Sequence, residues 1–253
     1  MKIKSNKFFI LILLFTAIVK LYAQPNVNNH IVDAAYIDTM IEHEKFFSAN
    51  DTVHAPAGVK WFRITNGSVN RIMFIAPHTT SQTREGKLKA ADAGTGSLIE
   101  ALNNLRDVPV LYTTYLSPSD PNYYDNNEFK DSLNEFLNDV KPMLVIDLHA
   151  SDYSRPYDID FGTMHGASLL DMGRWLDTLT RELQTSGITN LSSNFFPAEK
   201  NETDTKFTSK HGYACLQLEI NAKYLSPSRG KSYAARTHAL LQALARFIDE
   251  IQR

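Results

Sequence analysis

Three hydrophobic runs in this sequence lead to side chains that can bind a metal or move a proton. The first run begins at Ile72 and reaches His78, the second begins at Met143 and reaches His149, and the third carries Glu219. Open α/β sheets bind ligands outside the carboxyl ends of their strands, so donors at the ends of separate strands can converge. Imidazole is a common zinc ligand, and a carboxylate beside a metal can act as a general base. The pattern therefore predicts a metal-dependent hydrolase that holds one Zn²⁺ ion.

The second and third runs indicate how these side chains are arranged. Strand periodicity places Asp147 on the same side as His149, so we expect Asp147 either to orient an imidazole or to bind a substrate amine. Glu219 lies in the apolar run Leu216-Gln-Leu-Glu-Ile-Asn221. A buried carboxylate needs a partner, which is either a metal-site water or, in a structural role, a lysine or arginine. We predict that Glu219 is the catalytic acid/base and that Asn221 contacts substrate.

The third metal ligand is less clearly indicated. A catalytic zinc usually has three protein ligands and a water, so His78 and His149 require one further donor. The compact pattern His-x-x-Glu is broken, because Ser81 occupies the last position. Glu85 is the nearest carboxylate and is the predicted third ligand, on condition that its loop folds back. Asp92 is the alternative third ligand, and Ser81 itself is a further candidate.

A substrate that carries a carboxylate needs a cation in the site. Arg84, Arg106 and Arg155 lie in segments near the proposed cleft, and arginine suits bidentate carboxylate recognition. We predict that Arg155, just after the His149 strand, contacts substrate. The loop from Asp120 to Tyr124 either lines a subsite or makes turns.

Apolar strands alternate with helical patterns over most of the chain. This alternation predicts a single α/β domain with a mostly parallel mixed sheet flanked by helices. The expected helices are 34–47, 94–105, 127–140, 168–185 and 231–252, and the expected strands are 60–65, 71–75, 108–113, 143–148, 157–162 and 213–220. Asn66-Gly-Ser68 predicts a hairpin between the first two strands. Residues 113–127 and 190–210 are expected to be long loops.

The first residues have the composition of an export signal. Three lysines precede the apolar run 8–19, and Leu21-Tyr-Ala23 offers a cleavage point. We expect residues 1–23 to be a signal peptide, with the hydrolase domain spanning 24–253. No cysteine follows the run, so a lipid anchor is not indicated. The predicted location is secreted or periplasmic, without a membrane span in the mature chain.

The charge balance of the chain argues against nucleic acid as a partner. Without Lys2, Lys4, Lys7 and Lys20, the 26 basic residues of the whole chain fall to 22, against 28 acidic residues. An acidic surface repels a phosphate backbone. Cys215 is the only cysteine and lies in an apolar run, so we expect a buried, inert thiol.

With these residues in view, the sequence resembles the N-formylglutamate amidohydrolase family, which is similar to zinc carboxypeptidases and aspartoacylases. The resemblance is carried by Ala76-Pro-His78, Asp147-Leu-His149-Ala, Asp158-Ile-Asp-Phe-Gly162-Thr163, and Leu216-Gln-Leu-Glu219-Ile-Asn221 followed by Tyr224. It implies a zinc-peptidase-like fold, His78 and His149 as zinc ligands, and Glu219 as acid/base. It also implies that Asp158, Gly162 and Thr163 form a loop at the pocket rim.

The leading functional hypothesis is a zinc-dependent amidohydrolase that cleaves the C–N bond of an N-acyl amino acid or small peptide carrying a carboxylate. The alternative is a binding protein that keeps the zinc-peptidase-like fold without its chemistry. The missing His-x-x-Glu spacing motivates this alternative. An exported location also fits poorly with intracellular histidine breakdown, so formylglutamate itself is not the expected substrate.

Overall fold

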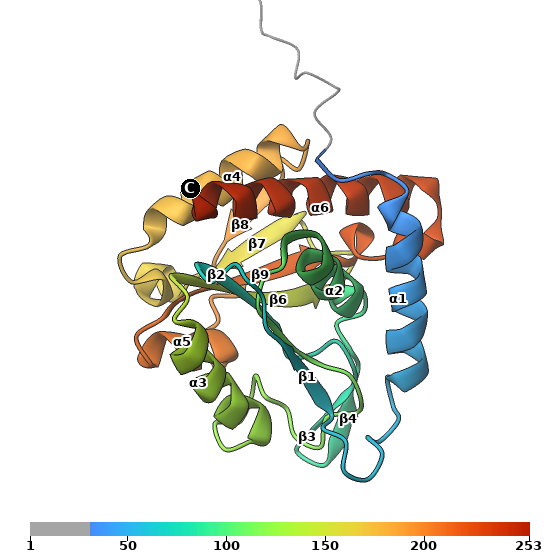
Figure 1. The fold of residues 1–253 in the computed structure, drawn as a ribbon, viewed down its shortest axis with the longest axis vertical. Coiled ribbons are helices and arrows are strands. Elements are labelled where there is room, and N and C mark those ends of the chain that lie inside the picture. The colour runs from blue at the N-terminus through green and yellow to red at the C-terminus, as the bar shows by residue number, and fades with distance from the viewer. Residues whose placement is uncertain (1–30) are drawn as a thin grey trace, which may run out of the picture.

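A computed structural model describes residues 31–253 as one α/β domain built on a seven-stranded mixed sheet (Figure 1). The strands lie in the order β1 (Phe62–Thr65), β5 (Val110–Thr113), β2 (Ile72–Ala76), β6 (Leu144–Ser151), β9 (Ala214–Asn221), β7 (Ile159–Gly162) and β8 (Leu191–Ser193). The central strands β5, β2, β6 and β9 are parallel to their neighbours in this group, whereas β1 and β7 join it in antiparallel fashion. A separate hairpin consists of β3 (Gln82–Arg84) and β4 (Lys87–Lys89). The predicted fold class is confirmed.

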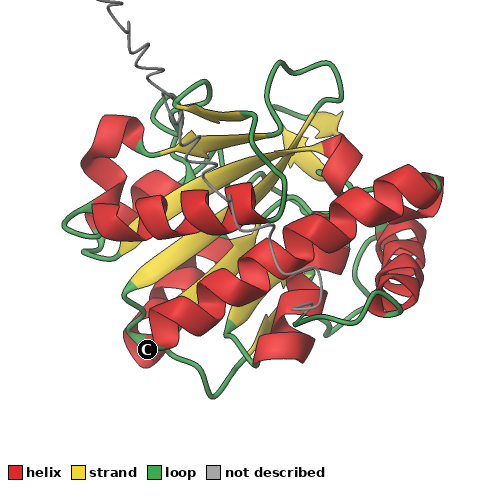
Figure 2. Ribbon diagram, turned by 90° about the horizontal axis from the view of Figure 1, so that it is seen from above, coloured by secondary structure: helices red, strands yellow, loops and turns green. Residues whose placement is uncertain are grey.

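Helices cover both faces of the sheet (Figure 2). One hydrophobic cluster holds residues of α1 (Tyr36–Asn50), α2 (Thr95–Arg106), α4 (Gly173–Thr185) and α6 (Lys231–Gln252). The other face packs against α3 (Glu128–Val140) and α5 (Asp204–Lys210). Short 3₁₀ turns lie at η1 (Met164–Leu169), η2 (Ala222–Tyr224) and η3 (Pro227–Arg229). The sheet is therefore buried on both sides, which explains its nearly continuous apolar strands.

Alternation along β6 divides its side chains between the two faces. Ile146 and Leu148 belong to the cluster with α2 and α6, whereas Val145 packs on the opposite face. Asp147 and His149 follow Val145 on that opposite face, at the carboxyl end of the strand. This face is therefore apolar where the helices cover it and polar at the end where the strands open to the site.

The predicted hairpin between the first two strands is wrong. β1 pairs with β5, and β2 lies inside the sheet with β5 and β6 on its two edges. The connecting segment crosses instead to the end of α2, where the backbone N–H of Val69 donates to Asp107 O. A Cβ on Gly67 would lie 2.0 Å from Asp107 O, so the glycine permits this close approach. Turn residues alone did not specify which strand became the neighbour.

Two further expectations about the elements are corrected. The region 190–210 is not a plain loop, because it contains β8 and α5. Thr203 caps α5 by accepting a hydrogen bond from the Lys206 N–H. The helix expected from 168 begins only at Gly173, since Leu170 has φ of 49°, which a helix excludes.

The thiol of Cys215 is buried as expected, and burial raises its pKa well above the ordinary value.

The predicted signal peptide, residues 1–23, lies outside the described residues. Within 31–253, no helix combines the length and apolarity needed to cross a membrane.

Candidate metal centre and active site

Three side chains from three different segments converge at the carboxyl edge of the sheet. His78 follows β2, His149 lies in the adjacent strand β6, and Asp92 precedes α2. The Asp92 N–H donates a 2.7 Å hydrogen bond to the His78 carbonyl, so the chain returns to the edge of the sheet before the helix begins. The donor atoms of the three side chains lie within 4.8 Å of one another. The residues therefore form a compact His-Asp-His cluster.

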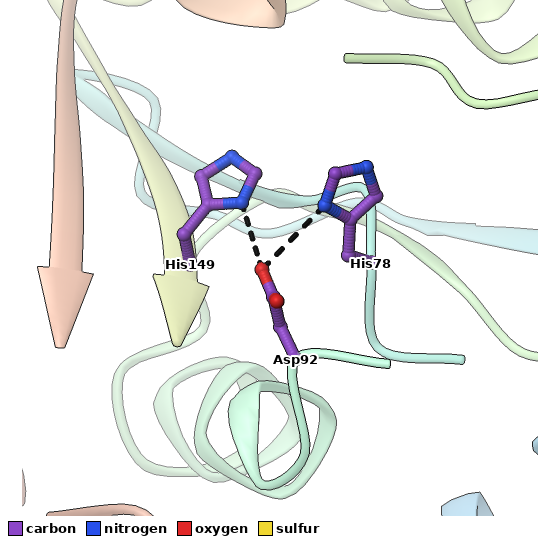
Figure 3. Close-up of side chains that lie close together, drawn as sticks. All are labelled: His78, Asp92 and His149. Atoms are coloured by element: carbon purple, nitrogen blue, oxygen red, sulfur yellow. Dashed lines mark hydrogen bonds and ion pairs between the residues drawn. The ribbon is translucent and has the colours of Figure 1, made fainter. Parts of the chain in front are cut away.

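The two imidazoles present the same nitrogen to the carboxylate. Asp92 Oδ2 lies 2.8 Å from His149 Nδ1 and 3.5 Å from His78 Nδ1. Figure 3 shows both Nδ1 atoms turned toward the Asp92 carboxylate, which sits between the rings. The side chains of His78 and His149 are 7% and 4% exposed, and that of Asp92 is 18% exposed. Asp92 is thus the most solvent-exposed of the three side chains in the cluster.

Each histidine has a second carboxylate at its other nitrogen. His78 Nε2 lies 2.8 Å from Asp120 Oδ1, and His149 Nε2 lies 3.1 Å from Asp147 Oδ1. Both aspartates are fully buried. The hydrogen bond between His78 Nε2 and Asp120 favours the tautomer with hydrogen on Nε2, which leaves the Nδ1 lone pair free for a metal. Asp147 lies close to His149 Nε2 without an aligned hydrogen bond, and its charge favours hydrogen on that nitrogen.

Opposite charges dominate the electrostatics of the cluster. Burial lowers the pKa of His78, but Asp120 and Asp92 outweigh it and raise that pKa to about 9. Burial likewise opposes the charged form of His149, yet Asp147 and Asp92 raise its pKa well above the ordinary value. Burial acts to raise the pKa of Asp92, and the two histidines together lower it instead. Three carboxylates around two imidazoles therefore favour positive charge at this point.

This donor set fits a divalent transition metal. Two neutral imidazole nitrogens and one carboxylate are three protein ligands of the kind found in catalytic zinc sites, which keep a fourth position for water or substrate. The outer carboxylates Asp120 and Asp147 supply the partners that metal-bound histidines normally have. A cation bound by His78, Asp92 and His149 would offset the excess of carboxylates around them.

Glu219 lies beside the cluster on the next strand. It is the register partner of His149 in the parallel pair of β6 and β9, so the two side chains point to the same face. Its Oε1 accepts a 3.0 Å hydrogen bond from Gln217 Nε2. Burial raises the pKa of Glu219 to about 7, helped by nearby carboxylates and opposed by His149. A structural role for Glu219 would have required an ion pair with a lysine or arginine. Within residues 31–253, Glu219 forms no such ion pair.

Glu85, the predicted third ligand, does not join the histidines. It lies in the exposed turn between β3 and β4 with φ of 51°, and its Oε1 accepts from the Tyr123 hydroxyl. Ser81 is also directed elsewhere, since its N–H and hydroxyl both donate to Asp51 Oδ1. The segment after His78 forms the β3–β4 hairpin instead of folding back, and Asp92 is the carboxylate that lies beside both histidines.

Asn221 and Asp147, two of the predicted substrate contacts, are internal. Asn221 is fully buried, and its amide approaches four backbone carbonyls of the segment 152–157 at 3.1–3.4 Å. It therefore holds that loop in place. Asp147 accepts from the Thr205 hydroxyl as well as facing His149. Its position matches the first of the two roles considered for it, the orientation of an imidazole.

The three arginines that the sequence placed near the cleft have different surroundings, and Arg106 lies at the end of α2 that is remote from Asp92. Arg84 forms an ion pair with Asp120, and Arg106 forms one with Asp249, so both are already neutralised. Arg155 is exposed, and its guanidinium lies 4.8 Å from the ring centroid of Phe196. Its contact with substrate stays a prediction.

The residues that the family resemblance placed at the pocket rim have local contacts within their own part of the fold. Asp158 forms an ion pair with Lys223 and accepts from the Tyr224 hydroxyl. Gly162 is buried in β7, where a Cβ would lie 2.6 Å from Phe196 O. Thr163 caps η1 by accepting from the Gly166 N–H. None of the three lines the pocket at Asp92.

That pocket has a volume of about 810 Å³. It is bounded by α1, the segment 90–97, the end of β6 and the region from η2 to η3. Thr79, which follows His78, and Ser151, two residues beyond His149 on β6, contribute to its wall. A chamber of this size is typical of small-molecule sites.

Asp92 and Asp120 are the site residues that the sequence indicated least clearly. Asp92 is only an alternative ligand by sequence, and Asp120 belongs to a loop expected either to line a subsite or to make turns. A signal for Asp92 was present, because it lies in the short segment before α2, where the chain re-enters the ligand-binding edge of the sheet. No comparable local signal marked Asp120, whose contact with His78 joins two separate loops.

Removal of the Asp120 charge should weaken metal binding without removing a ligand. In Asp120→Asn, the carboxylate that accepts from His78 Nε2 is lost, so the tautomer with a free Nδ1 is no longer favoured. We expect Zn²⁺ affinity to fall about 10- to 100-fold, measured by competition with a chromophoric chelator. Asp131→Asn, an exposed change on α3, is the matched control. Unchanged affinity in Asp120→Asn would contradict the assigned role.

Fold and cluster together define an α/β protein with a candidate metal centre at the carboxyl edge of its sheet. No family model and no curated protein matches the sequence. Among solved structures, it is similar to N-formylglutamate amidohydrolase from Ralstonia eutropha, with 14% identity and a TM-score of 0.57, covering 77% of this chain and 99% of that one. A protein from Agrobacterium tumefaciens is similar at 13% identity and a TM-score of 0.51, covering 77% and 97%. The family resemblance seen in the sequence is thus confirmed at the level of the fold.

Proposed function

We propose that this protein is a zinc-dependent amidohydrolase that cleaves the amide bond of an N-acyl amino acid or small peptide. The observation that carries the proposal is the convergence of His78 Nδ1, His149 Nδ1 and the Asp92 carboxylate, with Glu219 beside His149 on the neighbouring strand. The fold of an N-formylglutamate amidohydrolase supports the reaction class. Asp92 supplies the third donor whose absence motivated the alternative of an inactive binding protein.

His78, Asp92 and His149 would hold one Zn²⁺ ion. When bound, such an ion polarises a carbonyl and lowers the pKa of water. Glu219 accepts a proton from the attacking water and later delivers it to the leaving amine. Asp120 and Asp147 keep the two imidazoles oriented during this exchange. Glu219 is positioned for this role by its register with His149 and by the hydrogen bond that its Oε1 accepts from Gln217 Nε2.

The cellular setting that we propose follows from the sequence. Cleavage after residue 23 would deliver a secreted or periplasmic enzyme, which acts on a small acyl amino acid or peptide with a carboxylate outside the cytoplasm. Arg155 is the sequence-based candidate for binding that carboxylate. Nucleic acid is not an expected partner.

Metal analysis combined with a substrate panel tests the proposal. We expect purified protein to contain one equivalent of zinc, and dialysis against a chelator to abolish hydrolysis of N-acyl amino acids and dipeptides. Added Zn²⁺ should restore it. Full activity in metal-free protein would disprove the mechanism. Stoichiometric metal without hydrolysis of any amide in the panel would favour the binding protein.

A further inference from the structure

The pocket beside Asp92 is far larger than a one-carbon acyl group needs. Its wall next to the metal ligand consists of residues with little or no side chain, namely Ala90, Ala91, Ala93, Gly94 and Ala150. Gly94 has φ of 90°, and a Cβ there would lie 2.0 Å from Leu225 O, so this part of the wall requires glycine. A formyl group would leave most of the 810 Å³ empty.

Most charged side chains that line the pocket are engaged locally. Lys45 pairs with Glu42 at 2.6 Å. Asp51 accepts two hydrogen bonds from Ser81, and Asp152 accepts two from Ser154. Glu44 on α1 accepts hydrogen bonds from Ser228. The rest of the wall includes Ile41, Phe47 and Leu225. These surroundings suit an uncharged chain over most of the pocket.

Arg229 is the exception among these charged groups. Its guanidinium lies 4.6 Å from the ring centroid of Tyr153, whose hydroxyl is 2.8 Å from Ser226 Oγ. Within residues 31–253, no carboxylate lies within ion-pair distance of Arg229. Stacking on an aromatic ring orients the planar guanidinium and leaves its N–H donors available for an anion.

We propose that this pocket is a subsite for an extended, uncharged peptide chain whose terminal carboxylate binds Arg229. This inference rests on the proposed function and names its substrate class: peptides that continue for several residues beyond the scissile amide, in preference to formylated amino acids. It also assigns carboxylate recognition to a residue of η3 that lines the pocket, in place of the sequence-based candidate Arg155, which does not line it.

Binding measurements in a Glu219→Gln background test the subsite without turnover. The probes are acetyl-trialanine, its C-terminal amide and acetyl-alanine, with affinities measured by calorimetry on the zinc-loaded protein. We expect the trialanine acid to bind at least about tenfold more tightly than the other two, because a charged hydrogen-bonded contact and apolar burial both contribute. Adding Arg229→Gln should remove the advantage of acid over amide. Adding Ser48→Trp, which fills the pocket from α1, should remove the advantage of length.

Matched controls separate these effects from loss of folding. Arg236→Gln removes an exposed arginine stacked on Tyr233 outside the pocket, and Ala49→Trp adds the same bulk at the next exposed position of α1. Both control variants should keep the preference for the acid over the amide and the preference for acetyl-trialanine over acetyl-alanine. Equal affinity for acid and amide, or a preference that survives Arg229→Gln, would overturn the subsite. If the preferences hold while wild-type protein hydrolyses no amide, the proposed function fails and the subsite stands.

Discussion

Glu219→Gln is expected to lower kcat for amide hydrolysis by about 10²- to 10⁴-fold, the usual contribution of a general acid/base. Glutamine has nearly the same size and can keep the contact with Gln217, but it cannot accept a proton from water. Zinc content should be unchanged, because Glu219 is not among the three converging donors. Continuous assays of the best substrate in the panel, together with elemental analysis, measure both quantities.

A matched control is available in Glu182→Gln. Glu182 is also largely buried, but it lies on α4 and pairs with Arg246, away from the cluster. Its substitution should cost stability and leave kcat intact. If Glu219→Gln hydrolyses substrate at the wild-type rate, or if it loses zinc in parallel with activity, Glu219 is not the acid/base.

Asp92→Asn is expected to raise the dissociation constant for zinc by at least about 100-fold. Loss of a direct ligand should cost at least as much affinity as the most damaging substitution of a residue that only hydrogen-bonds a ligand. An amide oxygen lacks the negative charge that the carboxylate brings between the two imidazoles. Hydrolysis should fall with the metal. Competition with a chelator and metal analysis after dialysis provide the measurement.

Glu85→Gln is the informative partner of this variant, since Glu85 and Asp92 are the rival third ligands of the sequence. Glu85 lies in the exposed β3–β4 turn and contacts Tyr123. Its substitution should leave both zinc affinity and turnover within about twofold of wild type, in line with the small effects of exposed changes. Strong zinc loss in Glu85→Gln, with metal retained in Asp92→Asn, would reverse the assignment.

Strand periodicity explains why part of the site was predictable. Asp147 and His149 lie two residues apart in one strand, so they share a face in any sheet that contains this run. An acidic residue in an apolar strand, such as Glu219, indicates function because burial of a carboxylate is costly. These inferences needed only local geometry and the knowledge that parallel strands align their carboxyl ends.

The remaining site residues depended on how loops pack. The alternation of apolar strands with helical patterns was enough to predict the α/β class, and residue types at strand ends were enough to predict the two histidines and the candidate acid/base. The folded chain was needed to show that Asp92 approaches the histidines, that Glu85 does not, and that Asp120 contacts His78. A loop's path is set by contacts with distant segments, such as the hydrogen bond from the Asp92 N–H to His78 O. No local pattern encodes such contacts, because they exist only once the separate segments have packed together.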